Sequence, residues 1–300
     1  MRTLTITRHF GRLGNNMNYI TQAIDYCLKH NINKLVFNKP VPGQNHQIGL
    51  LIKGIDIIIN EGNDSNEYVN ENHWGHYFYK STLSFIERKE LIQKFIVPNL
   101  LIIPKNINQN DLVIHLRGGD IFSRGHYAYI QPPISFYKKI IEKQNWNNIY
   151  LVSEDNKNPC FDILKETYNC ISCLDNDNRH GGNYWGFSDD ISLMLGSTHF
   201  VASKSSLSPL IIQLSKTIKN VYLCDFFIDE PSKRNQSKSQ EFEKNENQIW
   251  WSNDFKNKKK DFKYNDIKIF VYDYSDYIIK FNKNNFDLSK QKNNQLMIIN

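Results

Sequence analysis

Residues 112–224 alternate between short apolar runs and segments whose apolar residues recur at helical spacing. The apolar runs predict buried strands, and the segments between them predict helices that pack on a sheet. The predicted strands are Leu112–Ile114, Ile149–Val152, Tyr168–Leu174, His199–Ala202 and Val221–Cys224. The predicted helices are Ile134–Lys143, Cys160–Thr167, Asp189–Gly196 and Leu210–Thr217. This alternation predicts an α/β fold with a parallel, doubly wound sheet.

The N-terminus shows the same kind of pattern. Leu4–Thr7 predicts a strand, Met17–His30 has the apolar spacing of a helix, and Leu35–Phe37 predicts the next strand. A glycine-bearing turn over Phe10–Met17 joins the first strand to the helix. A strand, a helix and a second strand in this order predict a parallel pair with a right-handed crossover.

The segment that follows is less regular. Ile55–Asn60 predicts a strand, the polar segment Glu61–Asn72 predicts a loop, and Leu83–Phe95 predicts a helix. A charged, asparagine-rich stretch over Asp229–Asn265 is typical of a linker, and Asp266–Tyr272 predicts a last strand.

We therefore expect three segments. They are an N-terminal Rossmann-like domain over residues 1–110, a second Rossmann-like domain over residues 111–228, and a polar linker with a C-terminal extension over residues 229–300.

Composition places the chain among ordinary globular proteins, with 40% hydrophobic and 23% charged residues. The formal net charge is +6, and the lysines concentrate in Lys256–Lys263 and Lys280–Lys292. No basic and aromatic stripe repeats along a helix, so we do not expect nucleic-acid binding. The N-terminus lacks the apolar run of a signal peptide, and no stretch reaches the length of a membrane span. The expectation is a soluble, cytoplasmic protein without a transmembrane segment.

Cysteine and histidine spacing does not predict a metal site. The five cysteines are scattered and odd in number, which argues against a disulfide framework. Cys170 and Cys173 form a lone C-x-x-C without the second pair that a zinc site needs. His73 and His76 likewise lack a third ligand nearby. We expect reduced, partly buried thiols and no bound metal.

The first candidate site follows the strand Leu112–Ile114, where the sequence reads H-L-R-G-G-D from His115 to Asp120. An open α/β sheet binds ligands at the carboxyl ends of its strands. Arg117 suits an anionic ligand because its guanidinium can grip phosphate or carboxylate oxygens in a fixed fork. The alternative is that Arg117 and Asp120 form a pair that only ties the loop down.

The second candidate site is the serine-rich turn Ser203–Ser208, which lies between a predicted strand and a predicted helix. The first turn of a helix has unpaired N–H groups and a partial positive charge, and it can hold a phosphate. The alternative is an ordinary serine N-cap. Arg117 at one strand end, with Ser205 and Ser206 at another, could clamp one diphosphate.

Three blocks of sequence resemble a known family. His115–Asp120 resembles the H-x-R-R-G-D motif of the α1,2-, α1,6- and protein O-fucosyltransferase superfamily. Gly11–Met17 resembles the G-x-L-G-N-Q-M block of its α1,2-fucosyltransferases. Asp190–Met194, followed by Ser203–Ser206, resembles their third conserved block. The blocks occur in the family's order over roughly Met1–Leu223.

The resemblance implies a GT-B-like pair of Rossmann-type domains with parallel sheets. It implies an inverting glycosyltransferase that transfers fucose from the donor substrate GDP-fucose to a glycan hydroxyl, without a cofactor or divalent metal. Donor binding would fall to residues at the three blocks: Arg117 at the β-phosphate, Asp190 at the guanine, Ser205 and Ser206 at phosphate oxygens, His115 near the ribose or diphosphate, and Gly14 and Asn15.

Two positions depart from the family pattern. Gly118 stands where the family has a second arginine, and Pro209 opens the stretch where a tryptophan pair often follows the serine turn. Two alternatives therefore stay open: a transferase for another nucleotide sugar, and a non-catalytic carbohydrate- or nucleotide-binding module.

The sequence offers two candidates for the catalytic base. Asp120 is the first candidate and Glu154, at the end of the next strand, is the second. Asp120 could instead only orient Arg117.

Overall fold

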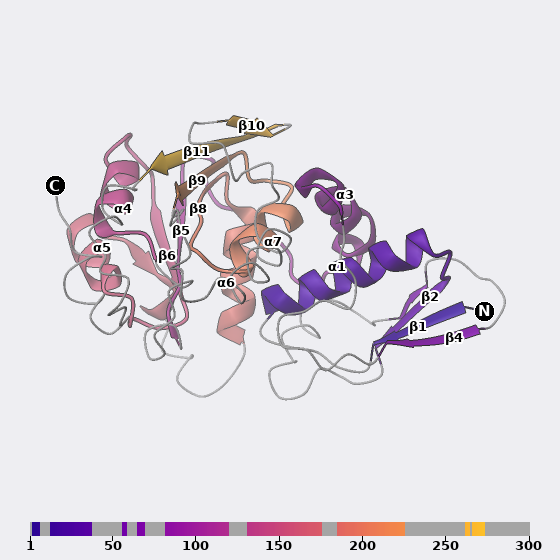
Figure 1. Cartoon of the computed structure of the whole chain (residues 1–300). Helices are drawn as coiled ribbons and strands as arrows, with labels where there is room; N and C mark the ends of the chain where they lie inside the picture. The colour runs from indigo at the N-terminus through magenta and orange to yellow at the C-terminus, as the bar shows by residue number, and fades with distance from the viewer. Residues whose placement is uncertain are drawn as a thin grey trace, which may run out of the picture. The chain divides into compact units, whose positions relative to one another are not determined.

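The computed structural model describes residues 2–6, 13–37, 56–58, 65–69, 82–119, 131–175, 185–225, 262–264 and 266–273 (Figure 1). The chain divides into two compact units. The first is built around Met1–Ile103, and Pro209–Leu214 groups with it. The second is built around Pro104–Ser208 and the strands that follow Ser215. Each unit has its own sheet.

The first unit holds a four-stranded sheet in the order β3-β2-β1-β4. Its elements are β1 (Arg2–Ile6), α1 (Leu13–Lys29), β2 (Lys34–Phe37), β3 (Asp56–Ile58), β4 (Ser65–Val69) and α3 (Phe85–Phe95). β1 runs parallel to both β2 and β4, whereas β3 pairs antiparallel with β2. The predicted strand, helix and parallel strand at the N-terminus are thereby confirmed.

α1 forms because apolar residues recur on one of its faces. Met17, Ile20, Ile24 and Cys27 are all fully buried. α3 contacts the same helix. The buried Arg88 donates through Nη2 to Asn18 Oδ1 on α1 at 2.7 Å.

Two predictions for the N-terminal unit were wrong. α1 begins at Leu13 and not at Met17, so Gly14 and Asn15 lie in the first turn of a helix and not in a loop. The predicted loop Glu61–Asn72 contains β4. The sequence of β4, S-N-E-Y-V, has almost no apolar pattern, and its pairing with β1 is made by backbone groups that every sequence carries.

The second unit holds a seven-stranded sheet in the order β10-β11-β9-β8-β5-β6-β7. The strands are β5 (Leu112–Leu116), β6 (Ile149–Ser153), β7 (Ile171–Ser172), β8 (His199–Val201), β9 (Asn220–Asp225), β10 (Phe262–Tyr264) and β11 (Ile267–Asp273). All pairings are parallel except that of β10 with β11. Six of the seven strands, all except β10, therefore run parallel to one another. This confirms the predicted α/β class with a parallel sheet.

The strands are linked by short segments and helices. These are η1 (Val97–Asn99) before β5, then α4 (Ile134–Ile141), α5 (Cys160–Tyr168), η4 (Cys173–Asp175), α6 (Trp185–Gly196) and α7 (Leu207–Leu214). From β5 the chain moves outward through β6 to β7, then returns to β8 on the other side of β5 and continues to β9. This order is compatible with a Rossmann-type unit, and it places the point of reversal between β5 and β8.

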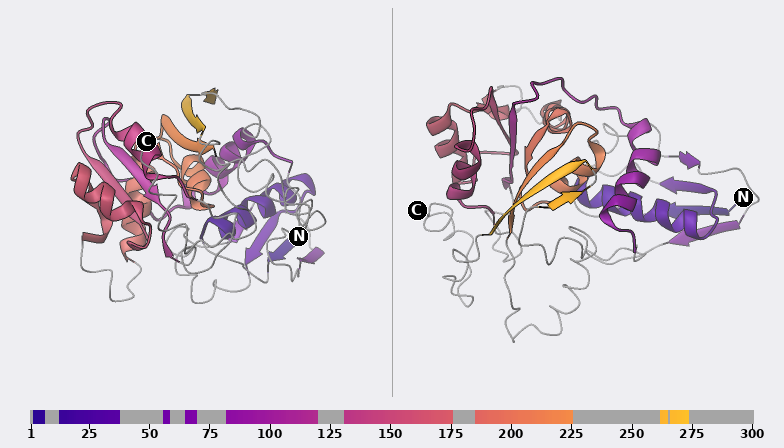
Figure 2. Two further views of the ribbon diagram at one scale, coloured as in Figure 1. Left: turned by 60° about the vertical axis from the view of Figure 1, so that its left-hand side comes forward. Right: turned by 90° about the horizontal axis from the view of Figure 1, so that it is seen from above.

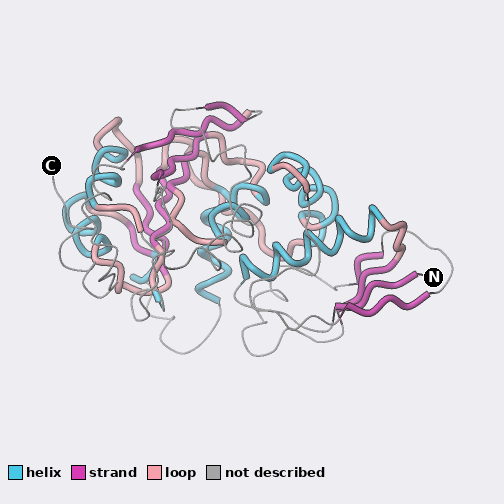
Figure 3. Tube along the Cα trace, viewed as in Figure 1, coloured by secondary structure: helices cyan, strands magenta, loops and turns pink. Residues whose placement is uncertain are grey.

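Different helices cover the two faces of this sheet (Figures 1–3). Leu112, Ile114 and Leu116 of β5 belong to one core cluster with the buried faces of α4 and α5. Successive side chains of a strand point to opposite faces, so Val113 and His115 lie on the other face, where α6 contacts β5.

Several predicted boundaries shift in the second unit. α6 begins at Trp185 and not at the predicted Asp189, and β7 has only two of its predicted residues. α7 begins at Leu207 and ends at Leu214, so Pro209 is its third residue. Proline is tolerated there because the first N–H groups of a helix have no partner within the helix. β11, beyond the polar linker, pairs with β9 as a strand of the main sheet.

The end of α6 packs so closely that only glycine fits. A Cβ on Gly196 would lie 1.8 Å from Lys105 O, while Lys105 N donates to Ser192 O at 2.9 Å. Gly196→Ala should therefore destabilise the protein by about 1–3 kcal/mol, the usual cost of overpacking. Urea denaturation would measure the change against Ser188→Ala in the same helix. Equal midpoints for the two variants would show that the segment at Lys105 moves aside freely.

Candidate functional site at the carboxyl ends of β5 and β8

The carboxyl ends of β5 and β8 lie side by side because the two strands pair in parallel, with Ile114 opposite Val201. His115 follows Ile114 in β5, and the turn that begins at Ser203 follows β8. Both predicted phosphate-binding segments therefore start at the point where the strand order reverses. Open α/β sheets bind their ligands at such a point.

A buried hydrogen-bonded group joins the two strand ends. His115 Nδ1 lies 2.9 Å from Ser208 Oγ and 3.0 Å from Ser203 Oγ, and the two hydroxyl oxygens are 3.3 Å apart. The backbone N–H of Ser203 donates to Ser208 Oγ at 3.1 Å. The three side chains are at most 7% exposed. They hold the serine turn and the start of α7 against the end of β5.

His115 is neutral in the folded protein. Burial, together with the nearby charge of Arg117, lowers the pKa of the imidazole from 6.5 to about 3. Ser208 Oγ already accepts from the backbone, so its own proton can be donated to Nδ1. Such a donation corresponds to the tautomer with its proton on Nε2. His115 thus acts here as a hydrogen-bond partner and not as a cation.

Arg117 directly follows β5, which ends at Leu116, and lies two residues beyond His115. Its positive charge contributes, after burial, to lowering the pKa of His115. The backbone of Arg117 is held from the neighbouring loop, where Asn158 Nδ2 donates to Arg117 O at 3.1 Å. The side chain is half-buried. The structure therefore brings Arg117 and the start of α7 to one edge of the sheet.

The serine turn is closed by local hydrogen bonds of Ser205. Ser205 Oγ accepts from Leu207 N at 3.2 Å, and Ser205 N donates to Ser203 O at 2.9 Å. Ser205 and Ser206 are both buried. α7 begins at Leu207, so its N-cap position is Ser206 and Ser205 lies one residue before it. The hydroxyl proton of Ser205 remains a donor for a second acceptor. Gln131 Nε2, just before α4, donates to Lys204 O at 3.2 Å and holds the turn from another side.

The loop after β6 contacts the turn that follows β5. Glu154 is exposed, and its carboxylate lies over Gly119, where a Cβ would meet Glu154 Oε2 at 2.4 Å. Gly119 has a φ of 72°, which L side chains rarely adopt, so glycine is required there. Asp155 Oδ1 accepts from Gly119 N at 3.0 Å.

The other predicted site residues lie elsewhere. Asp190 is buried in the middle of α6, on a different element from the hydrogen-bonded group. Gly14 and Asn15 belong to α1 in the first unit. Asp120 lies outside the described residues.

Sequence reasoning missed three polar residues that shape the site: Gln131, Asp155 and Asn158. Asn158 has a local signal, since its Oδ1 caps α5 by accepting from Cys160 N at 3.0 Å across the intervening proline. Gln131 and Asp155 have no such signal because their partners, Lys204 and Gly119, are far away in sequence.

The C-x-x-C pair is not arranged as a dithiol site. All five cysteines are free, and Cys170 lies in the apolar core whereas Cys173 is half-buried beyond the exposed Ile171. Burial raises the pKa of the Cys170 thiol to about 12, and its Sγ donates to Leu164 O at 3.2 Å. Such a thiol is unreactive at neutral pH.

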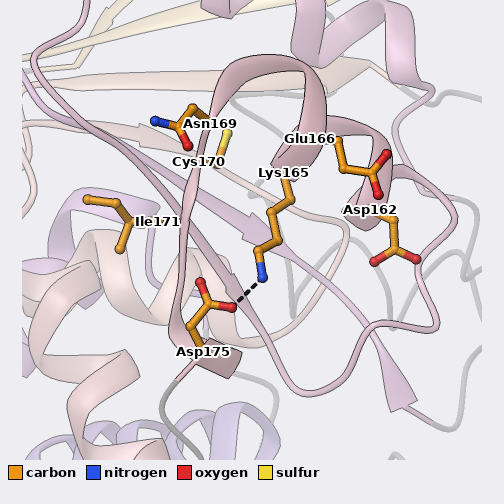
Figure 4. A pocket seen from close by; sticks show the side chains of 7 residues that line it. All are labelled: Asp162, Lys165, Glu166, Asn169, Cys170, Ile171 and Asp175. Carbon is orange, nitrogen blue, oxygen red and sulfur yellow. Dashed lines mark hydrogen bonds and ion pairs between the residues drawn. The ribbon is translucent and has the colours of Figure 1, made fainter.

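A separate polar hollow of about 590 Å³ lies between α5 and the edge strand β7 (Figure 4). Lys165 and Asp175 form an ion pair across it. Its lining consists of Asp162, Lys165, Glu166, Asn169, Cys170, Ile171 and Asp175. β7 is separated from β5 by β6, so this hollow is not part of the site between β5 and β8.

Comparison with family models, with curated proteins and with solved structures finds no match to this chain. Within the described ranges, no group of three or more histidine, cysteine or acidic side chains is placed to hold a metal ion. None of the helices in those ranges combines the length and the apolar character that a membrane crossing requires.

Proposed function

We propose that the chain is an inverting glycosyltransferase that binds a nucleotide diphosphate sugar at the carboxyl ends of β5 and β8, with GDP-fucose as the donor. The observation that supports this most is the group formed by His115, Ser203 and Ser208, which holds the start of α7 next to the loop of Arg117. The resemblance of the His115–Asp120 motif to fucosyltransferases supports the choice of donor.

In this proposal the diphosphate lies between the Arg117 guanidinium and the first turn of α7. Negative charge grows on the leaving diphosphate as the glycosidic bond breaks. A fixed guanidinium and the positive end of the α7 dipole stabilise that charge without reorganising during the reaction. Ser205 and Ser206 would donate hydrogen bonds to phosphate oxygens.

The acceptor hydroxyl of the glycan must lose its proton during the transfer. Glu154 is exposed at the end of β6, beside Gly119, and its carboxylate is a candidate base. Asp120 remains the other candidate. Replacing each by its amide and comparing turnover at matched donor concentration would identify the base, since only one amide variant should lose most of its activity.

A transferase for another nucleotide sugar is the second candidate. It is favoured by one feature of the loop after β5: Gly118 adds no second positive charge, and the carboxylate of Asp155 lies beside it. A donor loop with one cation and a nearby carboxylate differs from the fucosyltransferase motif at the position that contacts the donor.

Melting temperatures separate the two candidates. A ligand that binds only the folded protein raises its apparent stability. We expect GDP to raise the melting temperature more than UDP or CMP at equal concentration. A larger shift with UDP would reject the fucosyltransferase proposal and favour the second candidate. Binding without turnover of any nucleotide sugar would favour a non-catalytic binding module.

Activity should persist in EDTA. In the proposed site the diphosphate charge is balanced by Arg117 and by the helix start, which makes a divalent cation unnecessary. The measurement is turnover of the nucleotide sugar with EDTA and with added magnesium or manganese. If EDTA abolished turnover and either metal restored it, a cation bound near Glu154 and Asp155 would be required instead.

A further inference from the structure

We infer that Asp155 is a positioning residue for Arg117, and that its carboxylate takes the space in which the side chain of a second arginine would begin. The inference rests on the proposed function, because its role is to orient the guanidinium toward a diphosphate. It concerns a residue outside the motif, on a loop about 36 residues further along the chain, as the Gly119–Asp155 hydrogen bond records.

The space beside Gly118 is filled by Asp155. A Cβ on Gly118 would lie 2.3 Å from Asp155 Oδ1, 3.2 Å from Asp155 N and 3.2 Å from Ser153 Oγ. The left-handed backbone conformation is found at Gly119 and not at Gly118. Glycine is therefore required at position 118 by the neighbouring carboxylate and not by the backbone. Asp155 in its observed position thus fits only beside a glycine at position 118.

The carboxylate of Asp155 is held by three contacts. Its Oδ1 accepts from Gly119 N at 3.0 Å and from Lys157 N at 3.1 Å, and its Oδ2 pairs with Lys157 Nζ at 3.1 Å. Ser153 Oγ donates to Asp155 O at 2.7 Å, which fixes the backbone of the same residue. The oxygen beside Gly118 is thus the end of a constrained side chain that cannot swing away without breaking hydrogen bonds.

These contacts, with one from Asn158, restrain the chain that follows Arg117. Its carbonyl accepts from Asn158 Nδ2, and the amide two residues later donates to Asp155. The β6–α5 loop therefore fixes the direction of the chain from Arg117 to Gly119. Because a guanidinium must match the positions of two oxygens at once, a shift of its backbone reduces its contact with a diphosphate. Removal of Asp155 should act on the ligand only through Arg117.

A double-mutant cycle tests this directly. Calorimetry would give the GDP dissociation constant of the parent, Asp155→Ala, Arg117→Ala and the double variant. We expect Asp155→Ala to weaken binding by about tenfold in the parent and by less than about twofold in the Arg117→Ala background, since residues that act through one contact are not additive. The same fold-change in both backgrounds would overturn the inference.

Two further variants control the result. Asp155→Asn keeps the oxygen that accepts from Gly119 N, so it should bind GDP nearly as well as the parent. Asp175→Ala removes a carboxylate after β7, paired with Lys165, and should leave GDP affinity unchanged. If Asp155→Asn lost as much affinity as Asp155→Ala, the charge and not the hydrogen bond would matter, and the inference would fail.

Hydrogen exchange of the ligand-free protein tests the positioning role of Asp155 separately from the proposed function. Asp155→Ala should speed exchange in the peptide that covers residues 113–119, whether or not GDP binds. Faster exchange in a protein that fails to bind GDP would retain the positioning role and reject the proposed donor. Unchanged exchange in Asp155→Ala would overturn the positioning role even if the parent binds GDP.

Discussion

Arg117→Ala lowers turnover of the nucleotide sugar by about 100-fold or more, which is the cost of removing one preorganised stabiliser of developing charge. Arg117 is half-buried at the point of strand reversal, next to the neutral His115. Because the diphosphate gains charge as its bond to the sugar breaks, the guanidinium contributes more in the transition state than in the bound donor. The loss should therefore be larger in kcat/KM than in GDP affinity.

Arg117→Lys is the matched variant. It keeps the positive charge but loses the two-pronged fork, so it should still impair turnover. Neighbouring Gly118 has no charge to substitute for it. Thermal unfolding of both variants should resemble that of the parent, because the residue is not in the core. Near-parent turnover in Arg117→Ala would refute the assigned role, and simple unfolding would show that Arg117 only ties the loop down.

His115→Asn makes stability less dependent on pH. The pKa of His115 is lowered to about 3, so between pH 6.5 and 3 the unfolded chain binds a proton that the folded chain does not. Stability therefore falls as the pH is lowered through this window, by up to about 1.4 kcal/mol per pH unit. Above pH 6.5 neither state is protonated at His115, and the contribution is constant.

Denaturant unfolding at several pH values from 7.5 to 4 measures this effect. The parent should lose stability more steeply than His115→Asn, and the difference between them isolates His115 from the other histidines. Asparagine is chosen because its side chain can still hydrogen-bond to the hydroxyls of Ser203 and Ser208. Parallel stability curves for the two proteins would mean that His115 titrates normally in the fold.

The central strand of the second unit was predictable because it is buried on both faces. β5 is buried at all five positions, and such strands appear in the sequence as continuous apolar runs. β4 was missed for the opposite reason, since its backbone pairing with β1 leaves no pattern in its side chains. α7 begins earlier than predicted because Pro209 belongs to its first turn, where a helix does not need the N–H that proline lacks.

The candidate site was predictable in its location but not in its internal contacts. Strand ends can be located from the apolar pattern, and the rule for open α/β sheets then indicates where Arg117 and the serine turn lie. The hydrogen bonds of His115 with Ser203 and Ser208 join residues that are about 90 positions apart in the sequence. The bonds of Asp155 with Gly119 and of Gln131 with Lys204 also join residues that are far apart in the sequence. Such pairs depend on the folded topology, which no local pattern encodes.

In the proposed function, guanosine diphosphate binds where β5 and β8 end. Hydrogen exchange of the parent with and without GDP tests it most directly, because each peptide reports its own protection. We expect slower exchange with GDP in the peptides that cover residues 113–119 and 203–208. Protection confined to other segments, or no protection by GDP while another nucleotide protects these peptides, would contradict it.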